Sequence, residues 1–536
     1  QMEIELDPGA VKEFVVMVGV GNEETAARVR EKYGRAGVVA KELAAIRALW
    51  EERLSNFKVT TPDPDFNRMV NIWNAYQCFL TFSWSRAASY IYVGLRDGLG
   101  YRDTVQDIQG VMHLAADTTA ERLSAMLAGQ KRDGSAVRLI PFHFAPGGEI
   151  DAERYPPRSD DALWLFPTVI RYLKESGDMA FLDRRLPYAD GGEATVYEHL
   201  KKALEFPLSH LGPHGLVLGL EADWNDCLVL ADTGETVFVS FQLYQGLVIF
   251  ASLAERKNHT SDLAWAQAER EKLSGNLQRH AWQKDRFVRA FLNIDGVVMG
   301  APGAEEGAVW LNPQSWSVIS GAATGEQATL AMDLAGKELA TEYGLMLCHP
   351  AFRKFGLPVI RAIVFLPGMK ENAGIFSHTQ GWAILAETML GRGDRAFAYY
   401  RNTSPARMND RADIRAMEPY VHGQFTHGKD SPHHGRSEVH WLTGTASTVQ
   451  VAAVEGILGV RPEFDGLVID PCIPSAWDGF RMERVFRGKK LSIAVENRTH
   501  AEKGVDHLVV NGETIKGNFI PITQLNDQNE VQVVMG

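Results

Sequence analysis

The segment from Val196 to Leu228 contains the pattern that decides the fold. It reads VYEHLKKALEF at 196–206, then the apolar run GLVLGL at 215–220, then the polar turn EADWNDCL at 221–228. Apolar residues recur every three or four positions in the first part, which predicts an amphipathic helix. The last part places Trp224 between two aspartates, Asp223 and Asp226, in one short turn. A helix followed by a polar loop is therefore the unit from which we interpret the rest of the chain.

The same unit recurs from about residue 60 to 455. Helical spacing is also found at 243–253, 262–280, 328–339 and 382–390, and the segments between the helices are rich in Gly, Pro, Trp and His. Many helices joined by polar loops favour a mainly α fold, a toroid of helical hairpins whose loops build a site at one end. After about residue 456 short alternating strands appear, at 467–469, 490–495 and 508–510, with an Asn511-Gly512 turn. They predict a small C-terminal β-domain.

The first residues have a different pattern. Residues 12–21 alternate as in a β-strand, and residues 23–55 resemble one long charged amphipathic helix. Because a single strand is not stable alone, we expect it to pair within this chain or to be the last strand of an upstream sheet. The chain begins with Gln1 rather than methionine, and we therefore expect that an N-terminal region is missing.

Composition excludes several functional classes. A chain of 536 residues is too long for one core and predicts two or more domains. The net charge of −12 argues against a nucleic-acid or anionic-membrane binder, so an anionic substrate would need a local basic pocket. Four cysteines lie far apart and indicate reduced, intracellular thiols. We found no apolar run of membrane-spanning length and no signal peptide, and we expect no membrane association.

Two polar clusters favour sugar chemistry. In the turn 221–228, Trp224 can stack on a pyranose and a neighbouring acid can protonate a glycosidic oxygen, although a capped helix start would look similar. In the segment 96–107, glycines bring Arg96, Arg102, Asp103 and Asp107 close together, where they could bind vicinal hydroxyls or form an ion-paired helix N-terminus. Arg86 lies in a weakly polar stretch and needs a partner, either a core carboxylate or a bound anion.

Two further clusters lie near the C-terminal end of the helical region. The segment 370–378 places Lys370, Glu371 and His378 on a loop that enters a helix, where they could form a polar pocket floor or be structural. The segment 424–445 is rich in histidine, but its spacing fits no standard zinc ligand set, and we predict no metal. Thr443-Gly444, at the start of a helix, is the better anion cradle.

Four motifs in this order resemble one known family. The motifs are YRDTVQD (101–107), ADWNDCL (222–228), KENAGIFSH (370–378), and GQFTHGKD (423–430) followed by WLTGTA (441–446). They are similar to those of the inverting glycoside phosphorylases of glycoside hydrolase family 94, the cellobiose and chitobiose phosphorylases. The match runs from about residue 60 to 536, and the chitobiose branch looks closest.

The resemblance implies a role for each matching position. Asp226 would be the general acid. The residues that would bind the sugar are Arg96, Asp103, Trp224, Lys370, Glu371 and Gln424. The residues that would bind phosphate are Arg86, His378, Thr443 and Gly444. Phosphate would be a co-substrate, with no other cofactor, and the protein would be cytoplasmic.

The resemblance also implies an architecture. Family members have an N-terminal β-sandwich, a helical linker, an (α/α)6 barrel and a C-terminal β-domain, and they are typically homodimers. Mapped onto this chain, residues 1–22 would be the last strand of the sandwich, 23–58 the linker, 59–455 the barrel and 456–536 the β-domain. We therefore expect a homodimer that needs the missing N-terminal region.

A phosphorylase needs one acid rather than two. Phosphate is already an anionic nucleophile, so a second carboxylate to activate water is unnecessary and would repel it. We expect phosphate to attack the anomeric carbon of a β-linked disaccharide while Asp226 protonates the leaving oxygen, giving an α-sugar-1-phosphate and a free sugar. Asp226 must then be protonated, and we expect Trp224 and partial burial to raise its pKa.

Several alternatives stay open. A cellobionic-acid or β-glucan-oligosaccharide phosphorylase of the same family would differ in its acceptor site, which Phe365 and Arg361 would border. An inverting hydrolase of the same fold would need a second carboxylate, for which Asp103, Asp107 or Glu371 could be proposed. A non-catalytic carbohydrate-binding protein would bind sugar without turnover.

Overall fold

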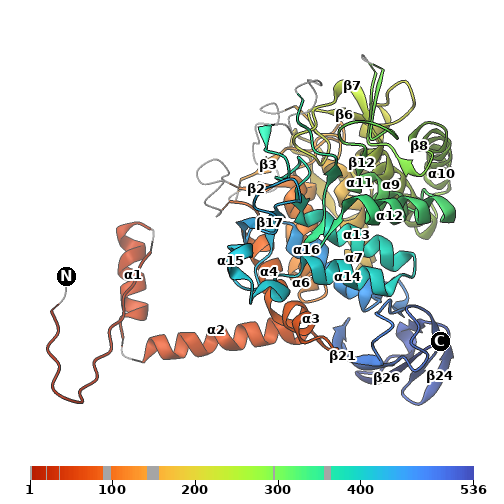
Figure 1. The fold of residues 1–536 in the computed structure, drawn as a ribbon. Helices are drawn as coiled ribbons and strands as arrows, with labels where there is room; N and C mark the ends of the chain where they lie inside the picture. Colours follow the sequence, from red (N-terminus) through yellow and green to blue (C-terminus); the bar gives the residue numbers. More distant parts are fainter. Residues whose placement is uncertain are drawn as a thin grey trace. The chain divides into compact units, whose positions relative to one another are not determined.

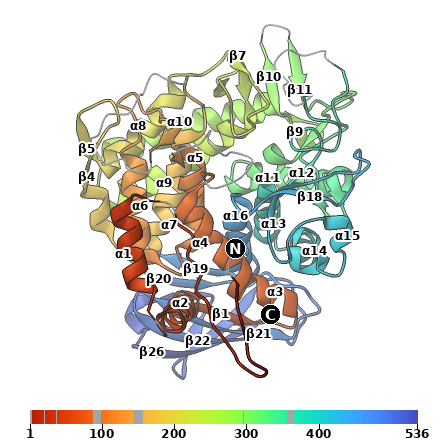
Figure 2. The ribbon, with the colours of Figure 1, turned by 90° about the vertical axis from the view of Figure 1, so that its left-hand side faces the viewer.

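The computed structural model describes residues 3–19, 21–35, 37–87, 98–141, 156–293, 296–354 and 364–536. The ribbon is shown in Figure 1 and, turned by 90°, in Figure 2. The chain divides into two compact units, Gln1–Asn56 and Phe57–Gly536, which are described separately.

The first unit contains two helices, α1 (Glu23–Tyr33) and α2 (Val38–Ser55), rather than the single long helix that was predicted. Helix α1 begins after Asn22, whose side chain accepts the backbone N–H of Thr25. The break lies at Gly34–Gly37, where Gly37 has φ of 79°, a left-handed conformation that ends the helical path. Residues 12–19 are in no strand and pair with no other described segment, so the expected pairing within this chain is wrong, whereas pairing with an upstream sheet stays a prediction.

The second unit is mostly helical up to residue 457. Its α-helices are α3 (Pro64–Arg68), α4 (Asn74–Trp84), α5 (Tyr101–Val111), α6 (Ala116–Leu127), α7 (Leu165–Ser176), α8 (Val196–Leu208), α9 (Val237–Arg256), α10 (Thr260–Asn276), α11 (Leu311–Ile319), α12 (Gly325–Leu339), α13 (Ser377–Met389), α14 (Gly393–Thr403), α15 (Ala412–Arg415) and α16 (Thr445–Val451). Three π-helical turns extend them, η1 (Met69–Trp73), η4 (Leu277–Ala281) and η7 (Ala452–Ile457). All five helices predicted from periodicity are present, and α8 begins with a Thr195–Glu198 capping box.

The C-terminal residues form a β-domain, as predicted. A six-stranded sheet has the order β1-β21-β22-β26-β23-β24, and a three-stranded sheet has the order β19-β20-β25. The strands are β1 (Phe57–Thr60), β19 (Val460–Glu463), β20 (Gly466–Ile469), β21 (Gly479–Phe486), β22 (Lys489–Glu496), β23 (Val505–Val510), β24 (Glu513–Lys516), β25 (Phe519–Pro521) and β26 (Gln528–Met535). Asn511 and Gly512 both have positive φ in the turn between β23 and β24. Strand β1, which sequence analysis did not anticipate, pairs with β21 and ties the start of the helical region to the C-terminal sheet.

Short strands connect the helices. Four of them form the sheet β11-β10-β7-β6, three form β16-β17-β18, and β2 pairs with β3. Their bounds are β2 (Leu99–Gly100), β3 (Leu139–Ile140), β6 (Leu218–Leu220), β7 (Ala231–Thr236), β10 (Ala290–Leu292), β11 (Val297–Met299), β16 (Ile375–Phe376), β17 (Gly423–Thr426) and β18 (Ser437–His440). The remaining pairs are β4 (Arg185–Pro187) with β5 (Glu193–Thr195), β8 (Trp282–Gln283) with β9 (Arg286–Phe287), β12 (Val309–Trp310) with β15 (Cys348–His349), and β13 (Ala340–Thr341) with β14 (Gly344–Leu345). In both views β6, β7 and β10 lie at the end of the helical region away from the C-terminal sheet (Figures 1 and 2).

Helix α9 lies in the main core of the second unit. Its apolar residues pack with those of α5, α7 and α8 in one buried cluster. A window of α9 has a mean hydropathy of 1.7, and 72% of it is buried. From the sequence we expected no apolar run of membrane-spanning length, but α9 is long and apolar enough to cross a membrane by length and composition. Its apolar surface is used for packing within the protein, as in a core helix.

Candidate active site

The turn that follows β6 is built around a buried carboxylate, Asp223. Its Oδ1 accepts the backbone N–H of Asn225, and its Oδ2 accepts the Thr236 hydroxyl, both at 2.8 Å. The same Oδ2 lies 2.5 Å from Arg289 Nη2, and neither side chain of this ion pair is exposed. These contacts hold the turn from inside. They leave Asp226, whose side chain is 52% exposed, at a pocket.

Two guanidinium groups contact Asp226. Arg102 Nη2 lies 3.0 Å and Arg158 Nη2 lies 2.9 Å from the same oxygen, Asp226 Oδ1. Desolvation raises the pKa of Asp226, but the charges of Arg102 and Arg158 outweigh it and hold the pKa below its ordinary value. The predicted rise in this pKa is therefore wrong for the ligand-free protein. Two arginines that are far from Asp226 in sequence reach its carboxylate in space.

Aromatic side chains hold Trp224 beside this carboxylate. The Trp224 ring centroid lies 4.9 Å from that of Trp382 and 5.2 Å from those of Phe376 and His378, each in an edge-to-face arrangement. Trp382 in turn stacks on Trp164. Aromatic pairs of this geometry contribute beyond the area that they bury. The Trp224 ring is therefore a fixed wall of the pocket.

Glu371 supplies a second carboxyl group, which is buried. Its Oε2 accepts the backbone N–H of Cys227 at 3.1 Å. Burial, followed by the charge of Asp226, raises the pKa of Glu371 to about 8, so this group is neutral at pH 7. The adjacent Lys370 has φ of 43°, and its Nζ lies 5.1 Å from the ring centroid of Phe365.

Arg86 lines the same pocket and lies on the segment after α4. Its Nη1 forms an ion pair with Asp107 Oδ2 at 2.7 Å, and its Nη2 lies 3.5 Å from Asp103 Oδ1. The Arg86 side chain is only 5% exposed. Arg86 therefore has a core carboxylate as its partner, and because it also lines the pocket, its binding of an anion stays a prediction.

His378 and Gly444 meet Arg86 there. A Cβ atom placed on Gly444 would lie 2.4 Å from His378 Cε1 and 3.1 Å from Arg86 Nη2. Burial and the charge of Arg86 lower the pKa of His378 to about 3, so the ring is neutral. Thr443 precedes Gly444, and its Oγ1 lies 2.8 Å from Thr445 Oγ1. Gly444 therefore lets the His378 ring and the Arg86 guanidinium approach its backbone closely, in the same pocket that Thr443 lines.

One pocket brings most of the predicted residues together. Its lining is Arg86, Arg102, Asp103, Arg158, Trp224, Asp226, Glu371, Phe376, His378, Gln424, Thr443 and Gly444. Of the predicted residues, Lys370 is not in this lining, and Arg96 lies outside the described residues, as does Arg361.

Two lining residues, Arg158 and Phe376, were not predicted, and Arg102 was predicted only as part of the 96–107 cluster, with no role carried over from the family. Arg158 precedes two adjacent aspartates, Asp160 and Asp161, and both of these carboxylates lie within 3.5 Å of Arg102 Nε. No spacing in the sequence links Arg158 to the 221–228 turn. Phe376 is an ordinary core residue by pattern.

Comparisons with known proteins identify the family. Residues 49–459 match the glycosyl hydrolase 94 superfamily catalytic domain, and residues 460–505 match the glycosyl hydrolase family 65 C-terminal domain. The N,N'-diacetylchitobiose phosphorylase of Vibrio proteolyticus is 39% identical over 99% of this chain and 68% of its own length. This chain belongs to the glycosyl hydrolase 94 superfamily. The resemblance inferred from the motifs is thereby confirmed.

Other matches extend this picture of the glycosyl hydrolase 94 chain. The solabiose phosphorylase of Paenibacillus borealis is 31% identical over 96% of this chain and 65% of its own length. Among solved structures, a sialidase is similar over 90% of this chain and 41% of its own, with a TM-score of 0.59 and 13% identity. At that identity the similarity concerns the fold alone.

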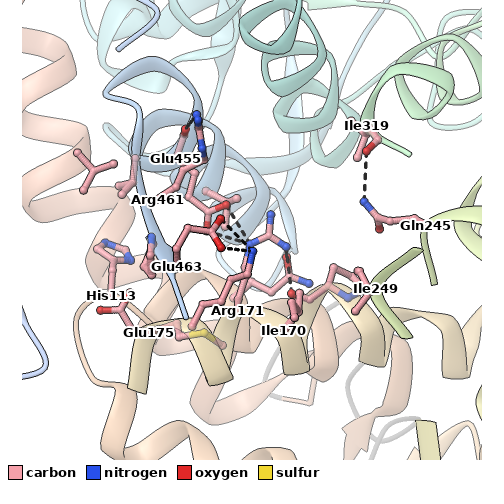
Figure 3. A pocket seen from close by; sticks show the side chains of 18 of the residues that line it. His113, Ile170, Arg171, Glu175, Gln245, Ile249, Ile319, Glu455, Arg461 and Glu463 are labelled. Atoms are coloured by element: carbon pink, nitrogen blue, oxygen red, sulfur yellow. Dashed lines mark hydrogen bonds and ion pairs between the residues drawn. The ribbon is translucent and has the colours of Figure 1, made fainter. Parts of the chain in front are cut away.

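The glycosyl hydrolase 94 chain has a second, larger cavity of about 310 Å³ between α5, α7, α9 and the first strand of the C-terminal domain (Figure 3). Its charged residues form ion pairs with one another, namely Arg171–Glu455, Lys174–Glu463 and Arg484–Glu175. Because its lining includes none of the residues predicted for catalysis or binding, we assign the chemistry to the pocket at Asp226.

Proposed function

We propose that this protein is an inverting phosphorylase that cleaves a β-linked disaccharide. In this reaction phosphate attacks the anomeric carbon, the glycosidic C–O bond breaks, and Asp226 donates its proton to the leaving oxygen. The products are an α-sugar-1-phosphate and a free sugar, and the proton that hydrogen phosphate carried is released from the sugar-1-phosphate and restores Asp226. The name of the Vibrio proteolyticus relative, an N,N'-diacetylchitobiose phosphorylase, favours N-acetylglucosamine as the donor sugar.

The observation that supports this proposal is the composition of the pocket. Asp226 lines it together with Arg86, His378, Thr443 and Gly444. A carboxyl group can serve as the proton donor, and a guanidinium that lines the same pocket suits an oxyanion. An acid and an anion cradle in one cavity are what phosphorolysis needs.

An inverting hydrolase is less well supported. It would need an ionised carboxylate opposite Asp226 to activate water. Glu371 has a pKa of about 8 and is neutral at pH 7. Asp107 is fully buried and paired with Arg86, and Asp103 also lies next to Arg86. The three carboxyl groups that sequence analysis offered as bases are thus neutral or next to a cation.

The acid role requires Asp226 to gain a proton in the complex, because its pKa is low in the ligand-free protein. A phosphate anion bound between Arg86 and Gly444 would add negative charge to the pocket and compete for its guanidinium groups. Like charge nearby disfavours ionisation of a carboxylate. We therefore propose that phosphate binding itself raises the pKa of Asp226 and prepares the acid.

We also propose that helices α4 to α16 form an (α/α)6 barrel. The mainly helical second unit and its match to the catalytic domain support this architecture. Phosphate as co-substrate without a further cofactor, a homodimeric state and a cytoplasmic location remain predictions of the same proposal.

Phosphate release in the synthetic direction tests the proposal. The protein is incubated with N-acetylglucosamine-1-phosphate or glucose-1-phosphate and one of four acceptors: glucose, N-acetylglucosamine, gluconate or cellobiose. Release of phosphate with one pair supports the phosphorylase and names its substrates, and gluconate would indicate an aldonate acceptor. Cleavage of a disaccharide without phosphate would instead indicate a hydrolase.

The variant Asp226→Asn tests the acid. We expect it to lose turnover while it still binds phosphate, because the amide cannot donate a proton to the leaving oxygen at neutral pH. Phosphorolysis rates and calorimetric phosphate binding are measured side by side. Retained activity would contradict the assignment.

A further inference from the structure

Gln106 on α5 fixes the hydrogen-bonding state of His378. Gln106 Nε2 lies 3.1 Å from the carbonyl oxygen of Arg102, which can only accept, so this end of the amide is the donor. The other end, Oε1, lies 2.9 Å from His378 Nε2. Because an amide oxygen can only accept, Nε2 of His378 carries the proton. The hydrogen-bond network therefore assigns the Nε2–H tautomer and leaves Nδ1 as an acceptor.

The free acceptor of His378 is directed at the anion cradle. A Cβ on Gly444 would lie 2.5 Å from Nδ1, and the same point is 3.1 Å from Arg86 Nη2. Among the described residues, Nδ1 of His378 has no hydrogen-bond partner. Because Gly444 has no side chain, Nδ1 of His378 and the Arg86 guanidinium lie close to each other and to its backbone, within the pocket that all three residues line.

The surroundings keep this ring neutral. The charged groups that act on His378 are Arg86, Asp103 and Arg102, with burial as the largest effect, and together they lower its pKa. The facing helix α16 has the sequence TASTVQV and contributes no charged side chain. His378 therefore cannot switch to a donor at Nδ1 by simple protonation at neutral pH.

The hydroxyl groups of Thr443 and Thr445 also have fixed hydrogen-bond directions. Thr445 Oγ1 donates to the carbonyl oxygen of Gly423 at 3.2 Å. The 2.8 Å contact between Thr443 and Thr445 must then be donated by Thr443. Thr443 Oγ1 also accepts the backbone N–H of Thr445 at 3.3 Å, so its proton is committed and one lone pair remains. The cradle thus combines one cation with two acceptors.

We propose that this cradle selects an oxyanion that carries a proton, and that Gln106 is the positioning residue for this selection. The P–O–H group of hydrogen phosphate donates to His378 Nδ1 while the other oxygens face Arg86. Sulfate has a similar size but carries no proton at neutral pH, so one of its oxygens would face the lone pair of His378 Nδ1 without a hydrogen bond. The inference rests on the proposed function and adds to it a rule for which anions the site accepts.

The native protein gives the first test. Initial rates of disaccharide cleavage are measured at pH 7 against phosphate, then with arsenate in its place, and then with sulfate as a competitor. We expect arsenate, which keeps a proton, to support turnover, and sulfate to inhibit with a Ki at least tenfold above the KM for phosphate. Sulfate that competes as well as phosphate would overturn the inference alone. Cleavage that needs no phosphate would overturn the proposed function instead.

The variant Gln106→Leu tests the positioning role, with Gln109→Leu as the control. Gln109 lies on the same helix but hydrogen-bonds to Thr168 and Arg171, away from the cradle. Without the Gln106 oxygen the ring can change tautomer and donate from Nδ1. We expect the ratio of sulfate Ki to phosphate KM to fall to about threefold or less in Gln106→Leu only. A parallel change of both constants would show a merely structural role and overturn the proposal.

A second variant keeps the test decisive if Gln106→Leu does not fold. His378→Asn places an amide that can present N–H groups to the anion, and we expect sulfate inhibition to strengthen relative to phosphate. Circular dichroism melting curves confirm the folded state of each variant. An unchanged sulfate-to-phosphate ratio in a folded His378→Asn protein would contradict the inference.

Discussion

Replacing Gly444 by alanine tests the anion cradle with a single methyl group. The new Cβ would lie 2.4 Å from His378 Cε1 and 2.5 Å from His378 Nδ1. The backbone itself accepts alanine, because φ is −62° and ψ is −6° at this position. The effect of the substitution is therefore steric, and it falls on His378, which we assign to phosphate binding.

The magnitude follows from these distances. Non-bonded carbon atoms prefer a separation of about 3.5–4.0 Å, so the histidine ring or the loop must move by about 1 Å. A misplacement of about 1 Å at a reacting centre costs about 100-fold in rate, or about 2.7 kcal/mol. Overpacking of this kind also lowers the free energy of unfolding by about 1–3 kcal/mol. We expect kcat/KM for phosphate to fall about 100-fold.

The assay is phosphorolysis at varied phosphate concentration, with thermal melting to follow stability. The control is Gly275→Ala on α10, where an added Cβ meets nothing within 4 Å. We expect this control to keep wild-type kinetics. A Gly444→Ala protein that is folded and has an unchanged KM for phosphate would refute the placement of the anion at this glycine.

Three further variants probe the surrounding charges. Arg158→Met removes one of the two cations that contact Asp226, so we expect the pKa of Asp226 to rise. The alkaline limb of the pH profile for phosphorolysis should then move to higher pH. An unmoved limb would contradict Asp226 as the acid. Glu371→Gln should stabilise the protein by up to about 3 kcal/mol at pH 7. The carboxyl of Glu371 has a pKa of about 8 in the folded protein, against an ordinary value of 4.5. The free energy of unfolding of the wild type is therefore highest below pH 4.5 and falls as the pH rises toward 8. Urea unfolding at pH 5 and 8 should show this loss in the wild type only. Arg289→Met leaves Asp223 buried without its partner and should cost about 3–5 kcal/mol in urea unfolding, whereas a cost below 1 kcal/mol would mean that the pair does not hold the turn.

Local pattern was sufficient for the helices and most of the C-terminal strands. Periodicity located α8 and α12 because each buries one face against a neighbour, and Asn511-Gly512 located a hairpin because both residues tolerate positive φ. The sequence pattern did not predict strands correctly where strand formation depends on a partner strand elsewhere. Residues 12–19 alternate like a strand but pair with no other described segment, whereas β1 is short and becomes a strand because β21 lies beside it.

The candidate site divides in the same way. The sequence by itself determined the family, through four ordered motifs, and with it most of the residues that line the pocket, including Asp226, His378 and Gly444. Only the tertiary structure decided the protonation of these groups. Arg158 and Arg102 lower the pKa of Asp226, and Gln106 sets the tautomer of His378. Electrostatic and hydrogen-bonding effects depend on distances between side chains, and those distances are set by folding rather than by spacing along the chain.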